Sequence, residues 1–252
     1  MNVRAIALPF LALALWELAG RTVFLPSDTT TRPSDIAVAV AGAAGDGSLA
    51  KATVETLSAA SIGFAVAVAL GILLAIPLGL SRDLRSITGL VIELLRPIPA
   101  VALIPLSLLI YGFGLSMEVM IVAFASIWPV LLMSVAAVRG IDPKLIEVAT
   151  NLELGRLDRI RKIVLPFIVP RLFVGLRLAA GVALVVAVTV EIAANPLGLG
   201  YALILAQQNL NPAWAYAVLI WIGVLGWGLN LTLVAVERSA FGRMLPSNWG
   251  VR

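Results

Sequence analysis

The sequence contains no cysteine and no histidine, and only 13% of its 252 residues are charged. The absence of cysteine excludes a disulfide framework and thiolate metal sites, and the absence of histidine removes the commonest general base and zinc ligand. Neither G-x-S-x-G nor H-E-x-x-H, two patterns of hydrolytic active sites, occurs in the chain. These absences predict a protein that is not an enzyme, with no catalytic residues and no metal site.

The chain has only three lysines, Lys51, Lys144 and Lys162, and none of them follows a glycine. A phosphate-binding P-loop requires Gly-Lys followed by Ser or Thr, because the loop amides and the lysine together hold the phosphates. The sequence therefore excludes a P-loop ATPase within this chain. If ATP drives the protein, hydrolysis takes place on another polypeptide.

Apolar residues make up 61% of the chain and the mean hydropathy is +1.04, whereas soluble domains have about 45–50% apolar residues. About 20 mainly apolar residues cross a bilayer as a helix, and no stretch alternates as a barrel strand does, so the sequence predicts an all-α membrane protein. The first window is expected to be a span and not a cleaved signal peptide, because the later spans need no removable signal. Six transmembrane helices are predicted in a single domain of residues 1–252, at roughly 5–26, 56–80, 87–112, 117–138, 167–192 and 213–236.

The distribution of basic residues predicts the orientation of the chain. If the N-terminus is cytoplasmic, every Lys and Arg of the connection 139–166 falls on the cytoplasmic side, and only Arg21, Arg32 and Lys51 fall outside. The positive-inside rule therefore predicts a multi-pass membrane protein with both termini in the cytoplasm. The net charge of +4 follows from this topology and requires no nucleic-acid partner.

The connection 139–166 carries the densest charge cluster and has its own local pattern. Asp142 followed by Pro143 is typical of a helix start, with an N-cap side chain and a proline at the first helical position. Gly155 is typical of a helix end, because glycine adopts the left-handed conformation without strain. The pattern predicts an amphipathic helix over 143–154, followed from Arg156 by a second, basic helix. Its apolar stripe consists of Leu145, Val148, Ala149 and Leu152.

This connection has two interpretations. It is either a docking site for a partner or a solvated loop whose arginines only orient the chain. The second interpretation explains the charges but leaves a capped helix with an apolar stripe and nothing to pack against it. The spacing therefore favours docking.

The stretch resembles the cytoplasmic EAA loop of bacterial ABC-importer permeases, whose pattern is Glu-Ala-Ala, a glycine four residues after the second alanine, and then Ile-x-Leu-Pro. Glu147 and Ala149 match its opening, and Ile163, Leu165 and Pro166 match its end. The glycine of the pattern is absent from its usual position, and the nearest glycine is Gly155, so we predict a first helix about half a turn longer than usual. The chain departs at two positions: Val148 replaces the first alanine, and Glu153 stands at the glycine position, with Gly155 two residues further on.

Three other segments are similar to permeases of the nitrate, sulfonate, taurine and bicarbonate group: "RPIPAVALIPLSLLIYGFG" (96–114), "GLRLAAGVALVVAVTVEI" (175–192) and "GLGYALI" (198–204). The likeness covers about residues 50–240. It implies a type I ABC-importer permease fold with six transmembrane helices and a cytoplasmic coupling helix, in a bacterial inner membrane. It also implies a translocation pathway for a small solute, an anion such as nitrate, a sulfonate or taurine.

The resemblance also implies the partners. These are a dimer of an ATPase that binds ATP and Mg, an extracytoplasmic solute-binding protein, and a second copy of the permease, with no cofactor on this chain. An ion- or proton-coupled secondary transporter, acting without an ATPase, is the alternative function. The implied ATPase-coupling residues are Glu147, Val148, Ala149, Leu152, Glu153, Gly155 and Arg156.

Charged residues and prolines inside the predicted spans are candidates for the substrate pathway. Glu93 and Arg96 share a helix face, and Pro97 and Pro99 favour a break of the kind tolerated in a bilayer mainly beside a cavity. Either these residues line the pathway, where Arg96 attracts an anion, or the charged pair lies near the inner headgroups and joins two helices. Glu191 either gates the pathway or anchors the outer end of the fifth span, and anchoring is favoured.

The second window contains Gly63, Gly71 and Gly79 at intervals of eight residues. Small residues at such a spacing let the backbones of two membrane helices approach closely. We therefore predict a packing face on this helix, without chemistry.

Overall fold

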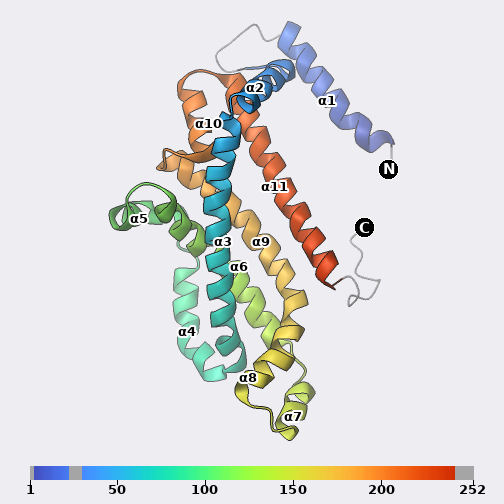
Figure 1. Cartoon of the computed structure of the whole chain (residues 1–252), viewed down its shortest axis with the longest axis vertical. Coiled ribbons are helices and arrows are strands. Elements are labelled where there is room, and N and C mark those ends of the chain that lie inside the picture. The colour runs from blue at the N-terminus through green and yellow to red at the C-terminus, as the bar shows by residue number, and fades with distance from the viewer. Residues whose placement is uncertain (1–2, 23–29, 242–252) are drawn as a thin grey trace. The chain divides into compact units, whose positions relative to one another are not determined.

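The computed structural model describes residues 3–22 and 30–241, and its elements are helices (Figure 1). This confirms the prediction of an all-helical chain. In chain order the elements are α1 (Val3–Thr22), α2 (Pro33–Gly45), α3 (Ser48–Leu80), α4 (Arg82–Leu95), the 3₁₀ turn η1 (Ala100–Leu103), α5 (Ile104–Tyr111), α6 (Leu115–Arg139), α7 (Pro143–Asn151), α8 (Arg156–Arg159), the π-helical turn η2 (Ile160–Val164), α9 (Leu165–Ala193), α10 (Gly198–Gln208) and α11 (Pro212–Phe241).

Four helices of the described residues are long and apolar enough to cross a bilayer: α3, α6, α9 from Arg171 onward, and α11. The pair formed by α4 and the η1–α5 segment qualifies as a fifth span if it is counted as one, although it is bent by 85°. An all-α membrane protein is thus confirmed. The count of six, which requires α1 as a further span, stays a prediction.

The third predicted window, 87–112, is not one continuous helix, and it breaks where its prolines predict a break. Arg96 caps the end of α4 by donating its backbone N–H to the carbonyl of Ile92 at 3.0 Å, and Pro99 is extended, with φ −62° and ψ 120°. Proline has no N–H and disfavours a helical conformation in the residue before it. The helix therefore ends at Leu95, and residues 96–99 lead into η1.

Internal contacts divide the chain into two compact units, residues 1–58 with 188–225 and residues 59–187 with 226–252. The first unit is built on a buried cluster from α2, α3, α10 and α11: Ala43, Leu49, Ala52, Leu199 and Val218. In the second unit, buried clusters join α3, α6 and α9. The single domain of residues 1–252 stays a prediction.

In the second unit α3 packs against α6 through an eight-residue repeat that both helices share. A Cβ atom added at Gly63 would lie 2.6 Å from Val122, one at Gly71 would lie 2.8 Å from Val130, and one at Gly79 would lie 2.5 Å from Val138. Real Cβ atoms essentially never come this close to another heavy atom. The two backbones are therefore too close for any residue except glycine, which confirms the predicted packing face.

We expect Gly71→Leu to destabilise the protein by about 1–3 kcal/mol, because the new side chain has no room beside Val130. The measurement is the thermal unfolding midpoint in detergent. The matched control is Gly181→Leu, because Gly181 lies in α9 with open space around the added Cβ. Equal midpoints for the two variants would contradict the packing argument.

Candidate functional site

The first turn of α7 is formed as the sequence predicts. Oδ1 of Asp142 accepts the backbone N–H of Lys144 at 2.9 Å, and the carbonyl of Asp142 accepts the N–H of Leu145 at 2.9 Å. Pro143 is the first helical residue, where a missing N–H removes no bond within the helix. The predicted helix start at residue 143 is therefore confirmed.

The end of α7 differs from the prediction of a helix that runs to residue 154. The helix ends at Asn151, and Glu153 has a φ of 52°, in the left-handed region. The N–H of Leu154 donates to the carbonyl of Ala149 at 3.0 Å, which makes this a Schellman arrangement with Glu153 in the place usually held by glycine. The prediction that Gly155 ends a lengthened helix is wrong, because the chain reverses at the glycine position of the EAA pattern with a glutamate in it.

The short helix α7 exposes most of its apolar stripe. Leu145, Val148 and Leu152 are 41%, 51% and 66% exposed, whereas Ala149 is completely buried. We call Leu145, Val148 and Leu152 the apolar face of α7. Glu147 is exposed as well. An apolar face that a helix presents to solvent is typical of a docking surface.

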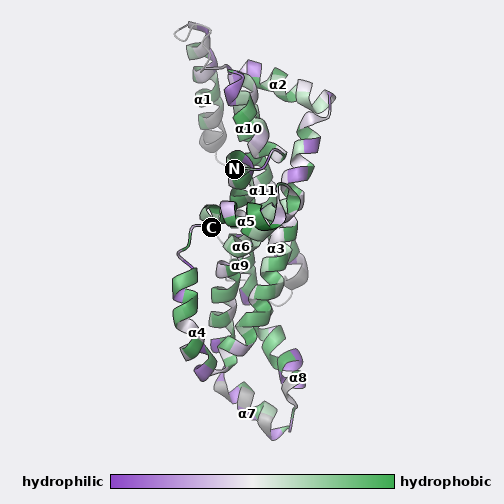
Figure 2. Cartoon of the chain, turned by 90° about the vertical axis from the view of Figure 1, so that its left-hand side faces the viewer, coloured by the Kyte–Doolittle hydropathy of each residue, from purple (hydrophilic) through white to green (hydrophobic). Residues whose placement is uncertain are grey.

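The return from α7 to the membrane passes through α8 and the π turn η2. Figure 2 shows hydrophilic colouring on α8, whereas α6 is mainly hydrophobic. Nζ of Lys162 lies 3.3 Å from Oδ2 of Asp158, an exposed ion pair of the kind that contributes about 0–1 kcal/mol. A Cβ atom added at Gly155 would meet no other heavy atom within 4 Å. Arg156 is the first residue of α8, and its side chain lies outside the described part of the structure.

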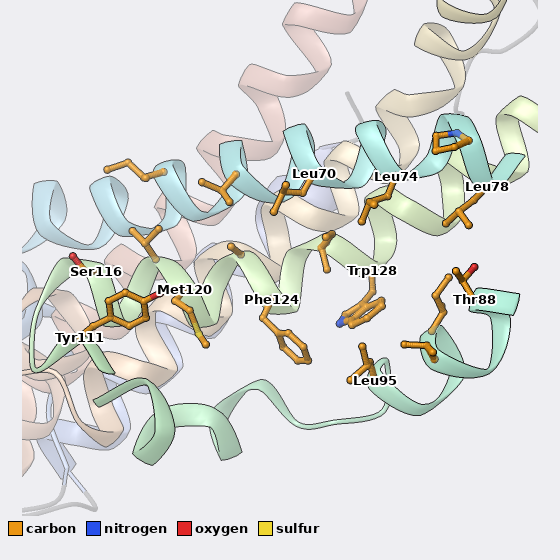
Figure 3. A pocket seen from close by; sticks show the side chains of 18 of the residues that line it. Leu70, Leu74, Leu78, Thr88, Leu95, Tyr111, Ser116, Met120, Phe124 and Trp128 are labelled. Atoms are coloured by element: carbon orange, nitrogen blue, oxygen red, sulfur yellow. The ribbon is translucent and has the colours of Figure 1, made fainter. Parts of the chain in front are cut away.

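Glu93 and Arg96 are both exposed, and no residue of α4 is buried. Within the described chain, no ion pair joins these two side chains. An apolar cavity of about 930 Å³ lies between α3, α4 and α6, lined by Leu74, Leu95, Trp128 and others (Figure 3). The predicted substrate-pathway residues of this region are not among its lining residues. A role in the pathway stays a prediction for Glu93, Arg96, Pro97 and Pro99.

Glu191 is 1% exposed and binds the first turn of α10. The first N–H groups of a helix have no partner within it, and carboxylates are favourable there because they complement the helix dipole. Glu191 therefore holds the first turn of α10. Its anchoring of the outer end of the fifth span and its part in the substrate pathway stay predictions. Three N–H groups are bound by side chains from α3 and α9: Gly198 donates to Oε2 of Glu55 at 2.9 Å, Leu199 to Oγ1 of Thr56 at 2.9 Å, and Gly200 to Oε2 of Glu191 at 2.7 Å.

Sequence reasoning missed Glu55, Thr56 and Glu118. Glu55 and Thr56 lie 143 residues before the amides that they bind, so no local pattern announces them. Glu118 is 2% exposed in the first turn of α6, and an acidic residue inside a predicted span was the available signal. Among the described residues, no group of three or more His, Cys, Asp and Glu residues is placed to hold a metal ion.

A second cavity, of about 650 Å³, lies in the first unit and is lined by residues of α2, α3 and α10. Its lining includes Asp46, Lys51 and Glu55. Hydrogen bonds from the side chain and then the backbone N–H of Ser48 hold the pKa of the Asp46 carboxyl below its usual value. The cavity therefore presents charges of both signs.

Comparisons with known proteins show the family to which the chain belongs. Residues 67–243 match the family described as binding-protein-dependent transport system inner membrane component. A putative ABC transporter permease protein of Methanocaldococcus jannaschii is 33% identical over 243 residues, which cover 95% of this chain and 91% of that protein. The taurine transport system permease protein TauC of Escherichia coli is 29% identical over 193 residues, which cover 77% of this chain and 70% of that protein.

Among solved structures, an inward-facing structure of the MetNI methionine ABC transporter is similar in fold. The TM-score is 0.62 at 19% sequence identity, and the match covers 73% of this chain and 90% of that chain. The chain belongs to the family of binding-protein-dependent transport system inner membrane components. It is an ABC permease, a multi-pass inner-membrane component that is not catalytic, and its class implies an ATPase and a binding protein as partners.

We expect Glu153→Gly to stabilise the end of α7 by about 0.5–1 kcal/mol, because glycine adopts a positive φ without the steric penalty of a side chain. Amide hydrogen exchange of residues 143–154 should slow. Glu153→Ala is the control, because alanine removes the same charge but keeps a Cβ in the left-handed conformation. Slowing by both variants to the same degree would show that the charge, not the backbone, matters.

We expect Glu191→Ala to lower the free energy of unfolding by about 1–3 kcal/mol, because the buried N–H of Gly200 then lacks its acceptor. Glu191→Gln keeps an acceptor oxygen and should cost less. Thermal unfolding in detergent compares the two variants. If Ala is tolerated as well as Gln, the hydrogen bond to Gly200 does not anchor α10.

Proposed function

We propose that this chain forms the translocation pathway of an ATP-driven importer for a small anion, powered by a separate ATPase that docks on α7. The observation that carries the proposal is the exposed apolar face of α7 on a capped helix at the EAA position. A helix face of this kind fits a groove on a partner. The coupling role of Glu147, Val148, Ala149, Leu152, Glu153, Gly155 and Arg156 is part of this proposal.

The assembly belongs to the proposal as well. The resemblance implies six spans in a type I fold and pairing with a second copy of this chain. The basic residues around α7 support a cytoplasmic position of α7 and of both termini. ATP and Mg bind the ATPase. Closure of the ATPase dimer displaces α7, and the membrane helices then alternate between an outward and an inward opening.

The solute class rests on relatives. The permease TauC belongs to a taurine transport system, and the Bacillus subtilis permease SsuC, 27% identical over 224 residues, is named for aliphatic sulfonates. Nitrate and bicarbonate permeases are similar too. Nitrate, taurine, methanesulfonate and bicarbonate are therefore the ligands to test against the solute-binding protein that partners this permease, with the melting temperature of that protein as the readout. Transport by this chain alone in liposomes with an ion gradient would instead support a secondary transporter.

We expect Val148→Asp combined with Leu152→Asp to weaken binding of the ATPase by about tenfold or more, because both side chains belong to the apolar face that the partner covers. Co-purification from membranes measures the association. The control is Val38→Asp, an equally polar change at a residue of α2 that is 72% exposed. An ATPase that stays bound to the double variant would rule out α7 as the docking helix.

A further inference from the structure

Arg171 lies near the start of α9 and contacts residues on both sides of the α7 connection. Its guanidinium carbon lies 4.4 Å from the centroid of the Phe167 ring, one helical turn earlier on α9. Its Nη1 donates to the carbonyl oxygen of Gly140 at 3.5 Å. One side chain thus joins the first turns of α9 to the residue that caps the C-terminal end of α6.

Gly140 leaves room for the guanidinium because it has no side chain. A Cβ atom added at Gly140 would collide with Nη1 of Arg171, so a larger residue displaces the guanidinium from its place. The last carbonyls of a helix carry a partial negative charge, which a guanidinium complements. The observed position of the guanidinium therefore requires a residue without a side chain at position 140, and a larger residue there would shift the end of the flexible arginine side chain.

The two helix ends also share an apolar core beneath this contact. Ile141 follows Gly140 and is buried together with Val164, Ile168 and Leu172. The coupling segment 142–163 therefore leaves the membrane helices and returns to them at one packed junction. Arg171, Gly140 and Phe167 close this junction.

We propose that Arg171 is a positioning residue that locks the end of α6 to the start of α9, so that a displacement of α7 moves both helices together. The inference rests on the proposed function, because an ATPase must supply the displacement. A planar guanidinium suits the role, since it stacks on an aromatic ring and donates in its own plane at the same time. Arg161, in the same connection, is exposed as Arg171 is, but it has no such ring contact or hydrogen bond among the described contacts.

The test uses the full permease–ATPase complex and the absence of cysteine in this chain. Single cysteines are placed at exposed positions of α9, Val174, Leu178 and Val185, and the rate of maleimide labelling is measured with and without ATP plus vanadate. The position with the largest ratio of the two rates reports the movement of α9. In Arg171→Ala this ratio is expected to move closer to 1, the value for two sites without coupling, while the ATPase stays bound and hydrolyses ATP.

Two further variants separate positioning from folding. Gly140→Ala keeps the arginine but displaces it and should also lower the ratio, whereas Arg171→Lys keeps the charge without the planar group and should give an intermediate value. Arg161→Ala removes an equal charge nearby and should leave the ratio unchanged. A native ratio in both Arg171→Ala and Gly140→Ala overturns the inference. Failure of the ATPase to bind the native chain overturns the proposed function, and the inference with it.

Discussion

The first amides of a helix have no partner within it, so where they are buried away from water they must find acceptors elsewhere in the protein. The start of α10 shows the constraint most clearly. Glu55, Thr56 and Glu191 reach its first amides from two other helices, and a buried carboxylate is tolerated because it is hydrogen-bonded there. The same demand explains why the interruption between α4 and η1 occurs at prolines, which have no amide to satisfy.

The parts of the fold that follow from local chemistry could be predicted from the sequence. Asp142 and Pro143 predict the start of α7. The eight-residue spacing of Gly63, Gly71 and Gly79 predicts a packing face, which in the structure contacts α6. The end of α7 could not be predicted in this way. A glycine is expected where the chain turns at the end of a helix, but here Glu153 adopts the left-handed conformation. The hydrogen bond from the N–H of Leu154 to the carbonyl of Ala149 shows in the structure where the helix ends.

The side chains that bind the first amides of α10 could not be predicted for a different reason, because two of them, Glu55 and Thr56, lie far away in the sequence. Glu191 was a candidate because acids are rare in spans, yet nothing in its neighbourhood indicates that it binds Gly200, or that Thr56 binds Leu199. For the substrate-pathway candidates Glu93 and Arg96, the sequence located the break beside them but left open what they face. The chain contains no P-loop, so under the proposed function ATP is hydrolysed on a partner.

The shared repeat of α3 and α6 limits which shape changes are available to the second unit. Because three glycine–valine contacts recur in step, sliding one helix along the other by a single turn would disrupt all three at once, and the pattern returns only after eight residues, or about 12 Å. A shift of that size is far larger than the 1–2 Å translations typical of packed helices. The three contacts therefore oppose sliding of α3 along α6, so these two helices keep their register when the second unit changes shape.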